Sequence, residues 1–258
     1  MTGNDRKGLV LQDRDRHLLR ELAVMRVIDR EQAKVAAGFG STTRANARLL
    51  ALVRSGLLKR FFLGTSGGGK KALYALSLSG AKLLNLPYRA PRRRHDELLV
   101  TDFFVAHQLA VNAVYCTMKY RPIPFPDARF IRWASFEKPI HGTQSLIPDG
   151  YFELIAQKPI AAFLEIDLGH EGHKVWKAKL EAYLRYAVSG QFESEFHQPR
   201  FRVFVIANSE RRAEAIRALA GTLTEKVFWF STVGLINGEG FWSSIWVRPR
   251  DNRRQPFV

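Results

Sequence analysis

Three acidic residues near the middle of the chain have the spacing to form a divalent-metal site. Asp149 follows a proline in the stretch IPDGYFELIAQKPIAAFLEID, and Glu165 and Asp167 lie at the end of its second apolar run. Residues two apart on a β-strand point to the same face of the sheet, so Glu165 and Asp167 share a side. Together with Asp149 they could form a three-carboxylate cluster, and carboxylate oxygens are the ligands that Mg²⁺ prefers.

The elements around these acids must bring them to one edge of a sheet. Hydrophobic patterning after residue 97 predicts a helix, three strands, an amphipathic helix, a buried strand, a further helix and a last strand. This α-β-β-β-α-β order matches the core of the PD-(D/E)xK nuclease-like fold. The predicted helices span 97–118, 173–190 and 211–221, and the predicted strands span 127–138, 151–156, 159–168, 201–208 and 226–233.

In that nuclease-like pattern, an acid on the second strand and an acid-x-lysine on the third hold a metal that polarises a phosphate, while the lysine orients or deprotonates the attacking water. Asp149 matches the first acid and Glu165 the second, but Asp167 stands where the pattern has lysine. Lys179, on the following helix, borders its sheet-facing side and is the substitute. One interpretation is an active Mg²⁺ site made of these four residues. The other, which we favour, is a group of strand-end acids paired with nearby Lys or Arg.

Basic residues are concentrated in the first part of the chain, whose overall formal net charge is +16. Residues 1–95 carry 20 Lys/Arg and 6 Asp/Glu, whereas residues 96–258 carry 20 and 18. Between Gln32 and His95 there are 13 basic residues and no acid. Charge of one sign on a compact domain raises self-repulsion, so this distribution predicts a polyanionic partner, namely nucleic acid.

The basic part has the element order of a winged helix. Periodicity predicts helices over 13–28, 30–39 and 42–56, with Asp29 and Ser41 as N-caps. Two strand-like runs around a glycine-rich tip follow, in LLKRFFLGTSGGGKKALYALS. In a winged helix the third helix enters the major groove of a duplex, and the tip of the hairpin lies along the phosphates.

This arrangement gives the basic residues separate roles. Thr43, Arg44 and Arg48 lie opposite the core face of the third helix and are candidates for contacts to base edges, because arginine can contact guanine in a bidentate manner. The hairpin lysines and arginines are candidates for phosphate contacts. The predicted DNA-binding residues are Thr43, Arg44, Arg48, Arg54, Lys59, Arg60, Lys70, Lys71, Arg92, Arg93 and Arg94. Two alternatives stay open, a solvated basic surface and a winged helix that contacts protein.

Other features exclude several classes of protein. The single cysteine, Cys116, lies in an apolar helical pattern, so disulfides play no part and we interpret it as a small core residue. The first twenty residues carry charges where a signal peptide needs an apolar stretch. Polar residues interrupt the most apolar segment, which favours a buried helix over a membrane span. These features predict a cytoplasmic protein, associated with the nucleoid through its DNA.

A shift in composition predicts two domains. Residues 86–97 combine two prolines with a run of arginines, which is typical of a boundary. We expect a winged-helix DNA-binding domain over 1–90, a basic linker over 91–97, a PD-(D/E)xK nuclease-like domain over 98–247, and a frayed basic tail over 248–258. The fold class expected is therefore α+β / α/β.

Several segments together resemble the replication-relaxation family of bacterial plasmid and mobile-element proteins over nearly the full length. They are LQDRDRHLLRELAVMRVIDREQ, RLLALVRSGLLKR, ALSLSGAKLL, LIPDGYFEL, AFLEIDLGHE, KAKLEAYLRY and VFVIANSERRAEAIRAL. The resemblance implies an N-terminal winged helix and a nuclease-like C-terminal domain. It also implies a role in plasmid replication, DNA relaxation, mobilisation or transcriptional control. The ExD form is the usual one in that family, so the resemblance leaves catalysis open.

The leading hypothesis is a sequence-specific protein that binds double-stranded DNA as a homodimer, with a non-catalytic second domain that also contacts other replication or relaxosome proteins. DNA binding then needs no cofactor. The first alternative is a Mg²⁺-dependent DNA nuclease or nickase that uses Asp149, Glu165 and Asp167 with Lys179. The second alternative is a protein-interaction subunit of a relaxosome.

Overall fold

The computed structural model describes residues 9–64, 68–88, 102–143 and 145–258. Packing divides the chain into two compact units, residues 1–112 and 113–258. The division falls inside helix α5 (Asp102–Tyr120), whereas composition had suggested a boundary near residues 91–97, which lie outside the described residues.

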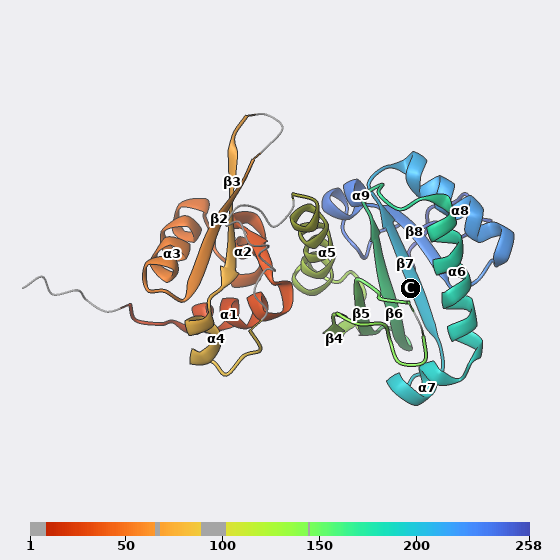
Figure 1. Ribbon diagram of the computed structural model, residues 1–258, viewed down its shortest axis with the longest axis horizontal. Helices are drawn as coiled ribbons and strands as arrows, with labels where there is room; N and C mark the ends of the chain where they lie inside the picture. Colours follow the sequence, from red (N-terminus) through yellow and green to blue (C-terminus); the bar gives the residue numbers. More distant parts are fainter. Residues whose placement is uncertain (1–8, 65–67, 89–101, 144) are drawn as a thin grey trace, which may run out of the picture. The chain divides into compact units, whose positions relative to one another are not determined.

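The first unit consists of helices and a three-stranded antiparallel sheet of order β1-β3-β2. The hairpin β2–β3 extends beyond the helices of this unit (Figure 1). Helix, strand, two helices and a hairpin form a winged helix, so this part of the predicted fold is confirmed. The short β1 and α4 were not expected. The elements before α5 are α1 (Asp13–Met25), β1 (Val27–Asp29), α2 (Arg30–Ala37), α3 (Thr42–Arg54), β2 (Leu58–Gly64), β3 (Lys70–Leu76) and α4 (Leu78–Leu83).

Local signals fix the ends of the helices in the first unit. The carboxylate of Asp29 accepts a hydrogen bond from the backbone N–H of Gln32 at 2.8 Å and caps α2. The hydroxyl of Ser41 accepts from the N–H of Arg44 at 3.3 Å and caps α3. Both caps satisfy backbone donors that have no partner inside the helix, as the sequence predicted.

A buried asparagine ties the first half of α5 to the first unit. The side-chain amide of Asn112 donates to the backbone carbonyls of Met25 and Val27, at 3.1 and 2.6 Å. A buried amide is costly unless both of its hydrogens are bonded, so these contacts hold α5 against the end of α1. Among the described residues, no helix combines the length and the apolar character that crossing a bilayer requires.

The second unit is built on a mixed sheet of order β4-β5-β6-β7-β8. Neighbouring strands are antiparallel from β4 to β6 and parallel from β6 to β8. This topology contains the predicted α-β-β-β-α-β order, so the fold class is confirmed. The elements after α5 are β4 (Arg129–Ala134), β5 (Gly150–Ile155), β6 (Pro159–Asp167), α6 (His173–Val188), α7 (Gln191–Phe196), β7 (Phe201–Ala207), α8 (Glu210–Leu223), β8 (Phe228–Thr232) and α9 (Val233–Gly238).

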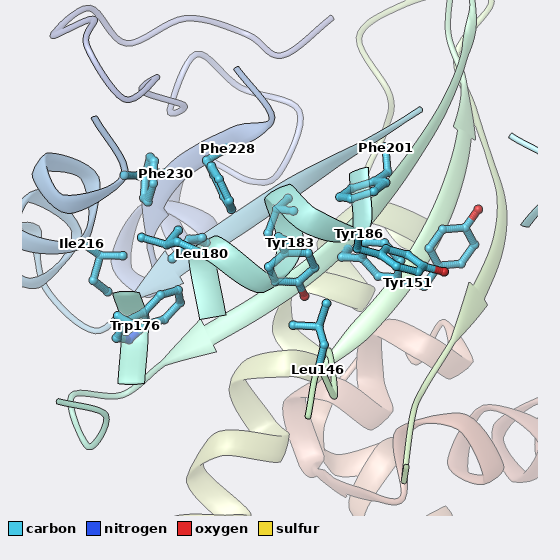
Figure 2. Close-up of a cluster of buried hydrophobic side chains, with 14 of the residues drawn as sticks. Leu146, Tyr151, Trp176, Leu180, Tyr183, Tyr186, Phe201, Ile216, Phe228 and Phe230 are labelled. Atoms are coloured by element: carbon cyan, nitrogen blue, oxygen red, sulfur yellow. The ribbon is translucent and has the colours of Figure 1, made fainter. Parts of the chain in front are cut away.

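Helices α6 and α8 cover one face of this sheet (Figure 1). Figure 2 shows Trp176, Leu180 and Tyr183 of α6 directed toward sheet residues such as Phe228. Aromatic rings dominate the cluster, and large buried rings contribute much of the free energy of folding. The result is a rigid helix-on-sheet layer that holds the carboxyl ends of β6 and β7 in fixed positions.

The other face of the sheet is covered in part by the end of the chain. Phe257 is 3% exposed, and its ring centroid lies 5.2 Å from that of Phe204 and 5.0 Å from that of Phe241. The prediction of a frayed tail over 248–258 was therefore wrong. The basic composition of this segment suggested a frayed end, but the segment contains Phe257. The free energy gained by burying this ring outweighs the entropic cost of ordering the last residues.

Candidate functional site

The third helix of the first unit presents a polar, basic face to solvent. Thr43, Arg44 and Arg54 are exposed, and within the described residues their side chains have no hydrogen-bond or ion-pair partner. Leu49 and Leu52, on the opposite side of the helix, are fully buried. The helical periodicity of the sequence therefore separates a core face from a face that is free to contact another molecule.

Arg48 differs from the other predicted contact residues because it is already engaged. Its Nε donates to Asp15 Oδ1 at 2.8 Å, and its Nη2 donates to Asp15 Oδ2 and to the carbonyl of Val10, the latter at 2.7 Å. The side chain of Asp15 is fully buried. The hypothesis that Arg48 contacts a base edge is therefore not supported, since its guanidinium holds the start of α1 against α3.

The Asp15–Arg48 pair is electrostatically strong. Burial alone would raise the pKa of Asp15, but the guanidinium of Arg48 and the backbone N–H of Gln12 outweigh it, so the pKa of this carboxyl is lowered. The carboxylate in turn raises the pKa of Arg48. Both groups stay charged, and the pair neutralises one cation of the first unit internally.

The cations of the hairpin are mostly exposed. The Nζ of Lys59 lies 3.4 Å from the hydroxyl of Tyr88, and the guanidinium of Arg60 lies 5.0 Å from the ring centre of Phe62. Lys70 is exposed, and Lys71 forms an ion pair with Asp29. Three predicted residues, Arg92, Arg93 and Arg94, lie outside the described residues.

In the second unit, Asp167 is enclosed by partners. Arg212 Nη2 lies 2.6 Å from its Oδ2, Trp176 Nε1 donates to the same oxygen, and the N–H of Gly169 donates to Oδ1. Burial opposes ionisation, but these donors outweigh it and lower the pKa of Asp167. Its carboxylate joins β6 to α6 and α8, and its lone pairs are directed to protein donors.

Glu165 lies on the same face of β6 and is also buried. Its Oε1 accepts from the hydroxyl of Tyr183 at 2.5 Å, and its Oε2 lies 2.9 Å from Lys179 Nζ. Glu171, which is partly exposed, contacts the same ammonium at 2.8 Å. Burial would lower the pKa of Lys179, but the two carboxylates outweigh it and raise the pKa, so this lysine is held in its charged form.

Asp149 has a role in the backbone hydrogen bonding of the sheet. Its Oδ2 accepts from the N–H of Ile166 at 2.7 Å, and its own N–H donates to the carbonyl of Leu164 at 3.0 Å. These bonds extend the β5–β6 ladder by one step beyond the pair Gly150–Leu164. The Pro-Asp element therefore has a structural use at the start of β5, independent of any metal.

Asp149, Glu165 and Asp167 each accept hydrogen bonds from protein donors. In the part of the chain that the structure describes, no group of three or more His, Cys, Asp or Glu residues is placed to hold a metal ion. The structure brings Glu165 and Lys179 together and places Asp149 close enough for its charge to act on Glu165. Asp167 instead pairs with Arg212.

Burial also makes Glu165 a weak acid. Removal from water raises its pKa to about 7, the charge of Asp149 adds to this rise, and the charge of Lys179 opposes it. The carboxyl therefore gains a proton near neutral pH in the folded protein, whereas an exposed glutamate releases it at much lower pH.

Sequence reasoning missed Arg212, Glu171 and Tyr183 as partners of the acids. A signal for Arg212 was present, because the carboxyl ends of adjacent parallel strands share one sheet edge. Arg212 follows β7 directly, at the start of α8, and Asp167 ends the adjacent strand β6. Tyr183 was recognised only as a core residue, since its hydroxyl contact has no sequence signature.

The chain was compared with known proteins. The family model described as Replication-relaxation matches residues 19–197. No curated protein matches the chain. One solved structure with similarity is that of Bacillus subtilis PadR in complex with operator DNA, at 16% identity and a TM-score of 0.22. The similarity covers 39% of this chain and 64% of that one, and at this TM-score it supports no functional conclusion.

The Asp15–Arg48 pair gives a first prediction. Arg48→Met leaves a buried carboxylate without its cation, so we expect the free energy of unfolding to fall by about 3 kcal/mol. Urea unfolding measures this change. Arg54→Met, in the same helix but exposed, is the control and should change stability by less than about 0.5 kcal/mol. Equal effects of the two variants would show that the pair contributes nothing to folding.

The raised pKa of Glu165 gives a second prediction. Between the ordinary pKa near 4.5 and the folded value of about 7, the folded state binds a proton that the unfolded state releases. This group therefore makes the free energy of unfolding fall as pH rises through that window. Glu165→Gln removes the titration, so wild type should lose about 1–3 kcal/mol more than the variant between pH 4.5 and 7.5. Parallel pH profiles of the two proteins in urea unfolding would contradict this.

Proposed function

The chain belongs to the replication-relaxation family, and we propose that it binds double-stranded DNA through its first unit. The observation that carries the proposal is the uncompensated charge on α3 and the hairpin. Arg44, Arg54, Lys59, Arg60 and Lys70 are exposed, and the chain from Gln32 to His95 contains no acid. When such cations bind a polyphosphate, the counterions of the polyphosphate are released, and this release favours binding.

The proposed mode of binding follows from the winged-helix architecture. The start of α3 enters the major groove, where Thr43 and Arg44 contact base edges and supply sequence specificity. Arg54 and the hairpin cations Lys59, Arg60 and Lys70 contact phosphates, which sets affinity and register. We leave Arg48 out of the proposed contact set because its Nε and Nη2 donate to Asp15 and Val10.

We further propose that the second unit is a non-catalytic scaffold for dimerisation and for contacts with other replication or relaxosome proteins. The engagement of Asp149, Glu165 and Asp167 by protein donors supports this role. A homodimer would match the two-fold symmetry of a palindromic DNA site. The process served would be replication, relaxation, mobilisation or transcriptional control on a plasmid or mobile element.

The DNA-binding proposal predicts a loss of affinity on removal of exposed α3 cations. Arg44→Ala combined with Arg54→Ala should raise the Kd for duplex DNA at least about tenfold, since the two arginines contribute about 1–3 kcal/mol or more together. Fluorescence anisotropy with a labelled duplex measures the change.

The matched control removes two cations from elsewhere. Lys177→Ala combined with Arg211→Ala alters exposed residues of α6 and α8 and should leave the Kd within about twofold. If both double variants weaken binding equally, affinity depends on net charge alone and the assignment to α3 is wrong.

The scaffold proposal predicts the outcome of a cleavage assay. Supercoiled plasmid incubated with the protein and Mg²⁺ or Mn²⁺ should stay supercoiled, because the candidate metal ligands are held by protein donors. Nicking that disappears in the Asp149→Ala variant would contradict the proposal and establish the nuclease alternative. Nicking that persists in that variant would point to a contaminating activity.

A further inference from the structure

A cavity in the second unit lies at the amino ends of the parallel strands. Its volume is about 740 Å³, which is in the range of small-molecule sites in proteins. Pro159, Phe201 and Val227 line it where β6, β7 and β8 begin. Asp167 ends β6, so the cavity is at the opposite end of that strand from the acidic cluster and is separate from it.

Positive charge dominates the lining of this cavity. Asp127 is the single acidic side chain among the lining residues. Within the part of the chain that the structure describes, none of the lining cations forms an ion pair, and none is within 4.0 Å of a carboxylate oxygen. The lining cations are Lys158, Arg200, Arg202, Lys226 and Arg248.

Arg202 lies close to two other cations of this cavity, Arg200 and Arg248. Burial and the charges of Arg200 and Arg248 lower the pKa of its guanidinium. Like charges held together in a partly desolvated cavity repel one another, and among the described residues no carboxylate forms an ion pair with them. A protein keeps such a cluster at a cost in stability, and binding of an anion would offset the cost.

Two of the guanidiniums are held in position by one indole ring. Arg202 lies 5.3 Å and Arg248 5.0 Å from the centre of the Trp229 ring, which supports both through cation–π contacts. Arg202 also donates to the carbonyl of Phe257, and Arg248 Nη2 donates to the carbonyl of Glu225 at 2.8 Å. The Nε of Arg248 is buried and has no acceptor among the described residues. The protein's own acceptors therefore leave part of both guanidiniums unsatisfied.

We propose that this cavity binds a phosphorylated small molecule of nucleotide size, with its phosphoryl groups against Arg200, Arg202 and Arg248. Arginine presents a planar set of donors that matches phosphate oxygens in a bidentate manner, and several arginines together call for a ligand with more than one negative charge. The volume exceeds what a phosphate chain alone would fill. Apolar lining residues such as Pro159 and Val227 are available to the remainder of the ligand.

A cavity of this kind is better suited to a small ligand than to a DNA duplex. Trp229 and Phe257, which support the arginines, are 7% and 3% exposed, so the cations sit against a recessed aromatic floor. A duplex is contacted by residues that project from a surface into a groove or along a phosphate backbone. This ligand site is therefore independent of the DNA-binding surface proposed on α3 and the hairpin.

The test is a calorimetric titration of the full-length chain in EDTA with ATP, GTP, pyrophosphate and a short single-stranded oligonucleotide. We expect saturable binding of at least one nucleoside triphosphate, weaker binding of pyrophosphate, and a Kd that rises with salt. Arg202→Gln should raise the Kd at least tenfold. Because Arg202 packs on Trp229, a second variant, Arg200→Ala with Lys226→Ala, alters only exposed side chains and should give a similar loss.

Two variants separate this proposal from DNA binding. Lys177→Ala with Arg211→Ala removes two exposed cations outside the cavity and should leave nucleotide affinity unchanged, as should Arg44→Ala with Arg54→Ala. The proposal is overturned if no nucleotide or pyrophosphate binds at millimolar concentration. It is also overturned if the cavity and control variants bind equally, or if only the oligonucleotide binds in a manner that depends on Arg200 and Lys226.

Discussion

The basic surface of the first unit depends on how few acids that unit has and where they are placed. Asp15 is buried against Arg48, and Asp29 is buried while it caps α2 and pairs with Lys71. These carboxylates serve the fold, so they hold elements together without screening the cations of α3 and the hairpin. Among the described residues of α3 and the hairpin, Arg48 and Lys71 are paired in this way, whereas Arg44, Arg54 and Lys70 have no ion-pair partner there and favour an external polyanion.

The second unit uses its acids differently. At the carboxyl end of β6, where a metal enzyme would keep ligands open to an ion, Asp167 joins Arg212 and Glu165 joins Lys179 and Tyr183. Breaking a buried pair of this kind costs several kcal/mol, so the pairs fix α6 and α8 on the sheet. This engagement of the acids by protein donors is the observation behind the scaffold role proposed for the second unit.

The helix caps and the order of the secondary-structure elements could be predicted from the sequence, because capping residues and hydrophobic periodicity are local signals. The capping roles of Asp29 and Ser41 and the α-β-β-β-α-β order followed from such patterns. The role of Arg48 could not be predicted in this way. A helical wheel gives the direction of its side chain but does not show that Asp15 is its partner. Asp15 shares a helical face with Leu18 and Leu22, and an acid at a core position is the signal that a buried cation was required. The cavity around Trp229 had no sequence signal, because its cations come from four separate segments of the chain.

The salt dependence of DNA binding tests the central claim most directly. With the Kd for duplex DNA measured over a range of salt concentrations, the logarithm of the association constant should fall linearly with the logarithm of salt concentration. The slope should correspond to several phosphate contacts and become shallower by about 1 when Arg44 and Arg54 are both replaced by alanine, because Arg54 is the one of the two assigned to a phosphate. A slope near zero, or one that those two replacements leave unchanged, would contradict the account that the free cations of α3 contact DNA.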